Sequence, residues 1–465
     1  MKATAQLTFE KIRFDQSTNA HLVVRLAAPP AQEAAARPPV CVIPVLDVSG
    51  SMEGEKLHHA RESILKLVDH LSPGDFCGVV VFSSQVHTIS APTAMGPVEK
   101  GALKAAVGRV QAEGNTNMGG GLLSGLDHAR VTKLPVGMPV RVILFTDGLA
   151  NAGPAKTGEE LKALLTANLG EATVSAFGYG EDADQELLQE LSNLGKGNYA
   201  YVHSPEDALT AFARELGGLL STHAQRIEVH LTASPGVELT EVVTDVDATG
   251  DQKDVVLRVP ELLAEEVRDL VLGVRLGPRP VALDAPVAVA DVDVGFERLE
   301  SGHLVRETAS CKAVVRFVEP GAAQLTPDPE LDRAVAIAQL VRVQIEAEEA
   351  ARRGQFAQAA GVVRLFQSAL VTRGHHQVAA AAGRLAATVH DEGAFQGSRA
   401  YRSSLRKGST RNVGSKYDAQ ADADLRAMGK GQSTEAQLRM ERSFRAQENP
   451  GGGSHRLDRR RSSRW

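Results

Sequence analysis

Short apolar runs alternate with amphipathic stretches from residue 40 to about residue 220. The runs occupy residues 40–46, 75–82, 140–145, 172–179 and 198–202. Near-continuous apolar runs of this length are typical of parallel strands that are buried on both faces. Between and after them, apolar residues at helical spacing predict helices over residues 55–71, 97–111, 119–131, 158–168, 183–193 and 205–220. We therefore predict an α/β domain over residues 38–222, with a doubly wound, mostly parallel sheet.

From residue 225 onward, apolar residues recur at every second position instead. Six such stretches cover residues 227–233, 237–243, 254–259, 268–276, 287–294 and 312–318. This pattern predicts an antiparallel β-sandwich over residues 225–320. Two further strands are predicted before the α/β domain, at residues 5–14 and 20–26. A hairpin alone is only marginally stable in water, so we expect residues 1–28 to complete the sandwich and the α/β domain to be inserted in it.

Helical periodicity returns over residues 328–392, where Ala334, Ala338, Val341 and Ile345 share one face of the first helix. We predict a small region of antiparallel helical hairpins there. Ser, Arg, Gly and Gln dominate residues 396–465, and large apolar side chains are sparse. This composition predicts a disordered tail. Two weaker helical patterns within it, at residues 419–428 and 434–447, are expected to form only on contact with a partner.

Charge is distributed unevenly along the 465 residues, whose net charge is −6. From residue 396 on there are 16 Lys and Arg against 7 Asp and Glu, so this segment carries +9 and residues 1–395 carry −15. An acidic folded body argues against nucleic-acid binding through that body. The basic tail, by contrast, suits an acidic partner.

The three cysteines, Cys41, Cys77 and Cys311, are too few for a disulfide framework, and two of them lie inside apolar runs. They are predicted to be buried thiols. No apolar run approaches about 18 residues, and the N-terminus lacks the apolar core of a signal peptide. We therefore expect a cytoplasmic protein without a transmembrane segment.

Oxygen-bearing side chains follow three of the predicted strands or helices. Asp47, Ser49 and Ser51 stand on alternate positions directly after the first apolar run. Thr116 lies in a loop rich in Gly and Asn, and Asp147 follows the run that ends at residue 145. Open α/β sheets place their ligands at the carboxyl ends of the strands, where we expect these residues to meet. Carboxylate and hydroxyl oxygens suit a hard divalent cation.

These motifs resemble the metal-ion-dependent adhesion site of the von Willebrand factor type A domain. The resemblance implies that Asp47, Ser49, Ser51, Thr116 and Asp147 hold Mg²⁺, with Mn²⁺ or Ca²⁺ as alternatives. It further implies that the ion captures an Asp or Glu of a protein partner, and that the protein is not an enzyme. The strands on both sides of the domain resemble the organisation of inter-alpha-trypsin inhibitor heavy chains. Plant-type proteins with this domain and a basic tail are also similar, but the zinc framework of those ring-finger proteins is lacking.

Three alternatives remain open from the sequence. Ser49 and Ser51 could cap the following helix without any metal. A dication beside Asp47 could activate water, which would make the protein a metal-dependent hydrolase. The protein could also be a scaffold that binds through its helices and tail, with a metal site that is only structural. Fold alone does not choose among these.

Overall fold

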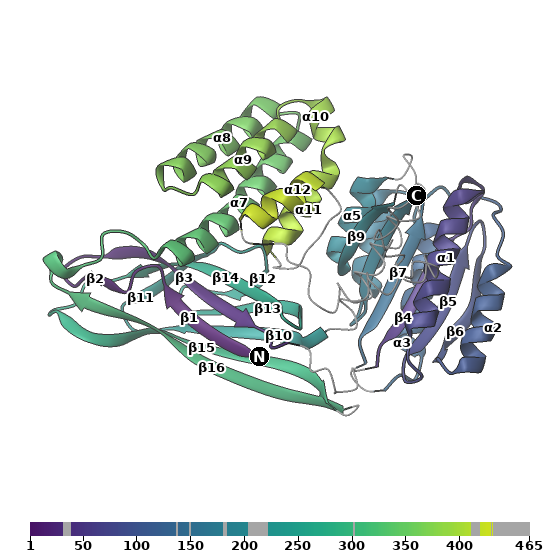
Figure 1. The fold of residues 1–465 in the computed structure, drawn as a ribbon, viewed down its shortest axis with the longest axis horizontal. Coiled ribbons are helices and arrows are strands. Elements are labelled where there is room, and N and C mark those ends of the chain that lie inside the picture. Colours follow the sequence, from purple (N-terminus) through teal and green to yellow (C-terminus); the bar gives the residue numbers. More distant parts are fainter. Residues whose placement is uncertain are drawn as a thin grey trace, which may run out of the picture.

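The structure is a computed structural model that describes residues 1–30, 39–135, 138–147, 150–179, 184–202, 222–300, 303–410, 419–428 and 430. Figure 1 shows three bodies: an α/β domain, a two-sheet β-sandwich and a group of helices above the sandwich. They correspond to the fold class that the sequence predicts, with one correction in the C-terminal segment.

The α/β domain is built on a six-stranded sheet with the order β6-β5-β4-β7-β8-β9. Its strands are β4 (Cys41–Asp47), β5 (Phe76–Phe82), β6 (Val86–Ala94), β7 (Val140–Thr146), β8 (Thr173–Tyr179) and β9 (Lys196–Val202). All neighbours pair in parallel except β5 and β6, which are antiparallel. Every residue of β4 is buried, as expected for a central strand that is covered on both faces. The predicted doubly wound sheet is confirmed.

Two layers of helices cover this sheet. Its described helices are α1 (Glu55–His70), α2 (Pro97–Gly108), α3 (Met118–Val131), α4 (Gly158–Asn168) and α5 (Gln185–Leu194). Leu57 and Leu103 of α1 and α2 pack in one apolar cluster with Leu46 of β4. Leu122 and the apolar residues of α4 and α5 pack in a second cluster with Val45, on the other face. The helix predicted over residues 205–220 lies outside the described residues.

The sandwich consists of a four-stranded sheet, β1-β3-β14-β11, and a six-stranded sheet, β12-β13-β10-β15-β16-β2. Its strands are β1 (Lys2–Leu7), β2 (Lys11–Arg13), β3 (Thr18–Ala27), β10 (Thr222–Ala233), β11 (Val237–Val242), β12 (Asp247–Gly250), β13 (Asp254–Leu263), β14 (Val267–Leu276), β15 (Leu283–Glu300) and β16 (His303–Val318). β3 pairs with β14 from Thr18↔Leu276 to Ala27↔Val267. The α/β domain is therefore inserted between strands of one sandwich, as predicted.

The single strand predicted over residues 5–14 is in fact two strands in different sheets. β1 pairs with β3, whereas β2 pairs in parallel with β16. The chain crosses between the sheets after Leu7, where the Thr8 amide still donates to the His21 carbonyl at 2.9 Å. Apolar residues occupy odd positions up to Phe9 but even positions from Ile12 on, and this change of phase in the sequence coincides with the crossing.

The helical region lies on the outer face of the sandwich. It comprises α7 (Pro329–Arg352), α8 (Phe356–Thr372), α9 (His376–Thr388), α10 (Glu392–Gly397), α11 (Arg399–Thr410) and α12 (Ala419–Ala427). Asp328 caps α7 by accepting hydrogen bonds from the amides of Glu330 and Leu331. Leu331 and Val335 of α7 pack on Val271 of β14. None of the helices in the described ranges is long and apolar enough to span a membrane.

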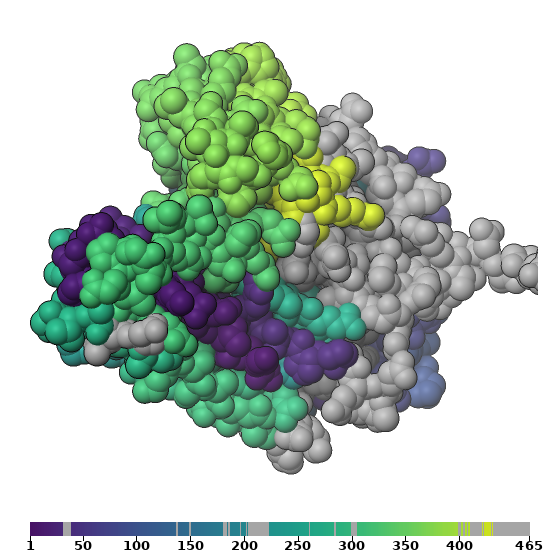
Figure 2. Space-filling model, turned by 60° about the vertical axis from the view of Figure 1, so that its left-hand side comes forward, coloured from purple at the N-terminus to yellow at the C-terminus, as the bar shows by residue number. Residues whose placement is uncertain are grey.

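The prediction of disorder from residue 396 is wrong for α11 and α12. Tyr401, Leu405, Leu425 and Met428 are buried in one cluster with α7, α8 and α9. Figure 2 shows the end of this segment, in yellow, against the green surface of the preceding helices. Each helix is too sparse in apolar residues to fold alone, but the face of α7 and α9 supplies the missing contacts. Residues 431–465, including the predicted helix at 434–447, lie outside the described residues.

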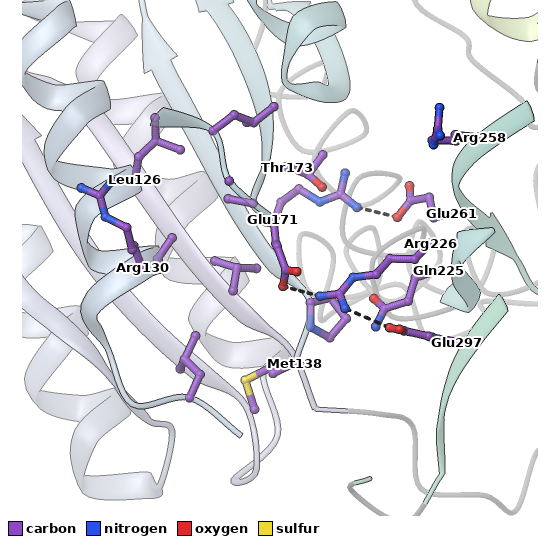
Figure 3. Close-up of a pocket in the computed structure, with 18 of the residues that line it drawn as sticks. Leu126, Arg130, Met138, Glu171, Thr173, Gln225, Arg226, Arg258, Glu261 and Glu297 are labelled. Atoms are coloured by element: carbon purple, nitrogen blue, oxygen red, sulfur yellow. Dashed lines mark hydrogen bonds and ion pairs between the residues drawn. The ribbon is translucent and has the colours of Figure 1, made fainter. Parts of the chain in front are cut away.

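Ion pairs join the α/β domain to the sandwich across a cavity of about 890 Å³ (Figure 3). Arg226 of β10 pairs with Glu171 of the α/β domain and, at 3.1 Å, with Glu297 of β15. Arg226 has a φ of 50°, at an irregularity in the pairing of β10 with β15. Arg141 of β7 reaches Glu261 of β13 at 3.0 Å. This junction therefore depends on charged side chains that span a gap, more than on close apolar packing.

One half-buried histidine is expected to make the stability of the sandwich depend on pH. His223 lies at an irregularity in β10, and its Nε2 is buried without a hydrogen-bond partner in the described part of the chain. Burial, with smaller effects of the N-terminal ammonium and Arg298, lowers its pKa from 6.5 to about 4. The unfolded chain therefore binds the proton more readily, and the free energy of unfolding should fall as the pH drops from about 6.5 to about 4.

The variant His223→Gln removes this titration while keeping a polar side chain. Urea unfolding of both proteins at pH 7.5, 5.5 and 4.5 should show a smaller loss of stability at low pH for the variant. Equal losses of stability in the two proteins would show that folding does not lower the pKa of His223.

Candidate metal centre at the carboxyl edge of the sheet

Three loops meet at the carboxyl ends of β4 and β7. The Gly50 amide donates to the Gly114 carbonyl at 3.1 Å, and the Glu113 amide donates to the Val48 carbonyl at 2.7 Å. The Asn151 amide donates to the carbonyl of Thr116 at 3.1 Å. These main-chain contacts join the loop after β4, the loop before α3 and the loop after β7 into one edge.

A row of hydrogen bonds connects four of the five predicted site residues. Asp47 accepts from the Ser49 amide at Oδ1 (2.9 Å) and from the Thr146 hydroxyl at Oδ2 (2.6 Å). The hydroxyl oxygens of Ser49 and Ser51 lie 3.1 Å apart, and Ser51 donates to Oδ1 of Asp147 at 2.8 Å. The structure thus brings Asp47, Ser49, Ser51 and Asp147 together, although 96 positions separate the last two.

Thr116 occupies a different place in the site. It is buried, with 3% of its surface exposed, on the loop that contacts both of the others. The amide of Thr116 donates to the side-chain oxygen of Asn151 at 2.8 Å, and the amide of Asn151 donates to the carbonyl of Thr116. Asn151 therefore holds both main-chain polar groups of Thr116. Among the described residues the Thr116 hydroxyl makes no hydrogen bond to the other four. Thr116 therefore joins the site through the position of its loop.

The two carboxylates of the site are both removed from solvent. Asp47 is fully buried, and the side chain of Asp147 is 0% exposed. Burial raises the pKa of Asp47 to about 6, and the nearby Asp147 adds to this, although bonds from Thr146 and Ser49 oppose it. The Lys56 ammonium lies 2.7 Å from Oδ2 of Asp147 and supplies one positive charge. Among the described residues, two buried carboxylates beside one ammonium give this edge a net negative charge, which favours a cation.

The donor set limits which cation fits. Within the described ranges, no group of three or more His, Cys, Asp or Glu side chains is placed to hold a metal. A cation at this edge must therefore be one that accepts hydroxyl and water oxygens beside two carboxylates. Mg²⁺ and similar hard dications have this preference, whereas Zn²⁺ favours nitrogen and sulfur ligands. The residues present fit a hard dication.

Sequence reasoning missed three residues at this site: Lys56, Thr146 and Asn151. The helical pattern assigns Lys56 to the polar face of α1, and the pattern alone does not show that this face begins beside Asp147. Thr146 could have been found from the sequence, because it is a hydroxyl-bearing residue at the end of β7, directly before Asp147. Asn151 lies beyond the strand, in a loop whose path the sequence does not define.

Two glycines within α3 determine how closely this helix approaches the sheet. A Cβ added at Gly121 would lie 2.4 Å from the ring of Phe82, and one at Gly125 would lie 2.6 Å from Val45. These two glycines let α3 pack directly on β4 and β5.

Comparison with known proteins agrees with this architecture. A family model for the von Willebrand factor type A domain matches residues 42–215. Inter-alpha-trypsin inhibitor heavy chain H1 of Mesocricetus auratus is 30% identical over 191 residues, which are 39% of this chain and 21% of that protein. An uncharacterized protein of Synechocystis is 26% identical over 277 residues, 57% of this chain and 64% of that protein. The chain spans only about a fifth of the length of the heavy chains it matches.

Solved structures show the same fold at low identity. A von Willebrand factor type A protein from Catenulispora acidiphila superposes with a TM-score of 0.61 at 17% identity, covering 93% of this chain and 96% of that one. The ArnB paralog VWA2 from Sulfolobus acidocaldarius gives a TM-score of 0.52 at 16% identity, with 82% and 92% covered. The family match, the relatives and the doubly wound sheet agree: residues 42–215 of this chain form a von Willebrand factor type A domain.

Proposed function

We propose that this domain is a metal-dependent protein-interaction module, in which a bound Mg²⁺ captures a carboxylate of a partner protein. Asp47, Ser49, Ser51, Thr116 and Asp147 would hold the ion. The observation that carries the proposal is the hydrogen-bonded row from Asp47 to Asp147, which places two buried carboxylates and two hydroxyls at the carboxyl edge of the sheet. Domains of this family typically mediate protein interactions, which supports the proposal.

The proposed metal ligands are of two kinds, charged carboxylates and neutral hydroxyls. Asp47 and Asp147 supply the only full negative charges of the set, while the serine hydroxyls are neutral oxygens. A dication held in this way keeps affinity for an incoming anion, such as the side chain of Asp or Glu. Ser51 is exposed, so the row opens to solvent at this residue, where a partner can approach. Both carboxylates are committed to the cation, which leaves neither as a general base, and we therefore propose binding and not catalysis.

Calorimetry with Mg²⁺, followed by a carboxylate probe, tests this function. The wild-type protein should bind Mg²⁺, and the loaded protein should then bind N-acetylaspartate amide but not its neutral counterpart, N-acetylasparagine amide. EDTA should abolish binding of the probe. Ser49→Ala should weaken Mg²⁺ binding by about tenfold or less, because water can replace one neutral hydroxyl. A wild-type protein that binds no Mg²⁺ at millimolar concentration would contradict the proposal.

A further inference from the structure

The first two helices of the helical group leave an open groove between them. α7 and α8 are connected by residues 353–355 only, so they run antiparallel and lie side by side (Figure 1). The groove has a volume of about 640 Å³. The residues of α7 that line it span positions 339 to 349, which correspond to about 15 Å along the helix axis. Its lining comes from one face of each helix and includes Gln339, Val343, Glu346, Glu349, Phe366 and Ala369.

The floor of this groove is apolar and only partly covered. Val343 and Phe366 pack against the buried cluster of the helical group, but each of them remains half-buried at its surface. Ile345 lines the groove as well and is also half-buried. Leu365 lies one turn before Ala369 and is 75% exposed, which is unusual for a large apolar side chain. The groove therefore offers apolar surface that the described part of the chain leaves uncovered.

Contacts within the chain close one end of the groove. Arg373, which follows α8, donates to the side-chain oxygen of Gln339 at 3.1 Å and pairs with Asp332. Arg342 pairs with Glu241 of β11, so it too has an acidic neighbour in the chain. The positive charges at this end are therefore balanced within the protein. An acidic ligand would have to displace these contacts in order to bind here.

Two carboxylates stand at the other end of the groove. Glu346 and Glu349 are one turn apart on α7, and both are exposed. Within the described ranges, neither of them has a hydrogen bond or an ion pair. Unpaired carboxylates beside an uncovered apolar floor favour a ligand that combines apolar side chains with positive charge. The chemistry of the groove thus matches a basic, amphipathic segment.

We propose that the groove between α7 and α8 docks a short amphipathic helix of a partner protein, with apolar side chains along one face and two Lys or Arg residues at one end. The apolar side chains contact Val343 and Phe366, and the cations pair with Glu346 and Glu349. A groove of about 15 Å accommodates about ten residues of helix. The groove lies outside the von Willebrand factor type A domain, so this docking does not require a metal ion.

Fluorescence anisotropy with a designed helical peptide tests this proposal. The probe carries Leu at positions i, i+3, i+4 and i+7, the spacing by which helices are recognised in grooves, and two Lys at one end. A peptide of the same composition in scrambled order is its control. The full-length protein in EDTA should bind the probe at micromolar concentration, about tenfold or more tightly than the scrambled peptide.

One matched pair of variants tests whether the probe occupies the groove. Ala369 is exposed and lines the groove, so Ala369→Arg places a bulky cation there and should weaken probe binding about tenfold or more. Ala357 is also exposed on α8 but does not line the groove, so Ala357→Arg should bind the probe as the wild type does. Circular dichroism should show that both variants keep their helices.

A second matched pair tests the two carboxylates. Glu346→Gln/Glu349→Gln should weaken probe binding about fivefold, because two exposed ion pairs are lost. Glu53→Gln/Glu113→Gln removes two exposed carboxylates from the α/β domain instead and should change binding by less than about twofold. Equal weakening by both double variants would show only a general attraction to an acidic protein and would overturn the proposal, as would equal binding of the scrambled peptide.

Two further measurements decide between a partner protein and other occupants. If replacement of Arg439, Arg442 and Arg445 by Gln in the full chain makes the probe bind about tenfold more tightly, the groove belongs to the basic C-terminal segment of the chain itself. If sedimentation shows a dimer of the wild type and a monomer of Ala369→Arg, the groove belongs to a second copy of the chain. Either result would overturn the assignment to a separate partner, whereas unchanged probe binding and a monomeric wild type support it.

Discussion

Asp47→Asn is expected to abolish Mg²⁺ binding and, at the same time, to raise the stability of the metal-free protein. Burial and the neighbouring Asp147 raise the pKa of Asp47 to about 6, so its charged form is disfavoured by roughly 3 kcal/mol at most. An amide in its place removes that penalty. It still accepts from the Ser49 amide, and the Thr146 hydroxyl can turn to accept from the new NH₂ group.

Thermal unfolding with and without Mg²⁺ measures both effects. In EDTA at pH 7.5, Asp47→Asn should be about 1–3 kcal/mol more stable than the wild type, and added Mg²⁺ should stabilise only the wild type. Asp47→Ala serves as the comparison, because it also loses the charge but leaves Thr146 and the Ser49 amide without their acceptor. It should lose metal binding without the gain in stability. Metal binding by Asp47→Asn equal to that of the wild type would refute the proposed site.

Truncation of the chain after Gly397 should destabilise the helical region, whereas truncation after Lys430 should not. The shorter protein loses α11 and α12, and with them the buried Tyr401, Leu405, Leu425 and Met428. Each such side chain contributes about 1.5–3 kcal/mol of apolar burial, which the conformational entropy of the two helices partly offsets. It also loses Asp424, which accepts from Tyr401 at 2.8 Å and pairs with Arg384 of α9.

Differential scanning calorimetry of the two truncated proteins and the full chain tests this expectation. The unfolding midpoint of the helical region should fall by more than about 5 °C after truncation at Gly397, and it should be unchanged after truncation at Lys430. Limited proteolysis of the full chain should leave a resistant core of about 430 residues. A core that ends near residue 395 would restore the sequence-based expectation of a tail without stable contacts.

The sequence predicts most of the α/β domain because its signals are local. The apolar runs of β4 and β7 identify buried parallel strands without knowledge of their neighbours. β6 was missed, since it is an edge strand whose residues are mostly exposed and which contains Pro92. Its place beside β5 depends on pairing with that strand and not on its own pattern. Edge strands and sheet crossings, such as the one after Leu7, are therefore the weakest part of the prediction.

The site shows the same division between local and long-range information. Asp47, Ser49 and Ser51 form a local motif, and Asp147 was predictable because strand ends share one edge of the sheet. The ion pair of Lys56 with Asp147 joins residues 91 positions apart, and it depends on how α1 begins. Likewise, α11 and α12 are stable only on a surface that α7 and α9 create. The features that could not be predicted from the sequence are those that depend on contacts between residues far apart in the chain.

The insertion of the α/β domain also imposes an order on synthesis of the protein. β3 ends at Ala27, but its partner β14 begins only at Val267. At about 5–20 residues per second, a ribosome needs roughly 10–50 s to cover that interval. During that time the first strands have no β14 to pair with, whereas the complete sheet of the α/β domain, which ends at Val202, emerges before β14 is made. Nascent chains are thus expected to contain a folded inner domain between two unfinished halves of a sandwich, so chaperone demand is concentrated on residues 1–27.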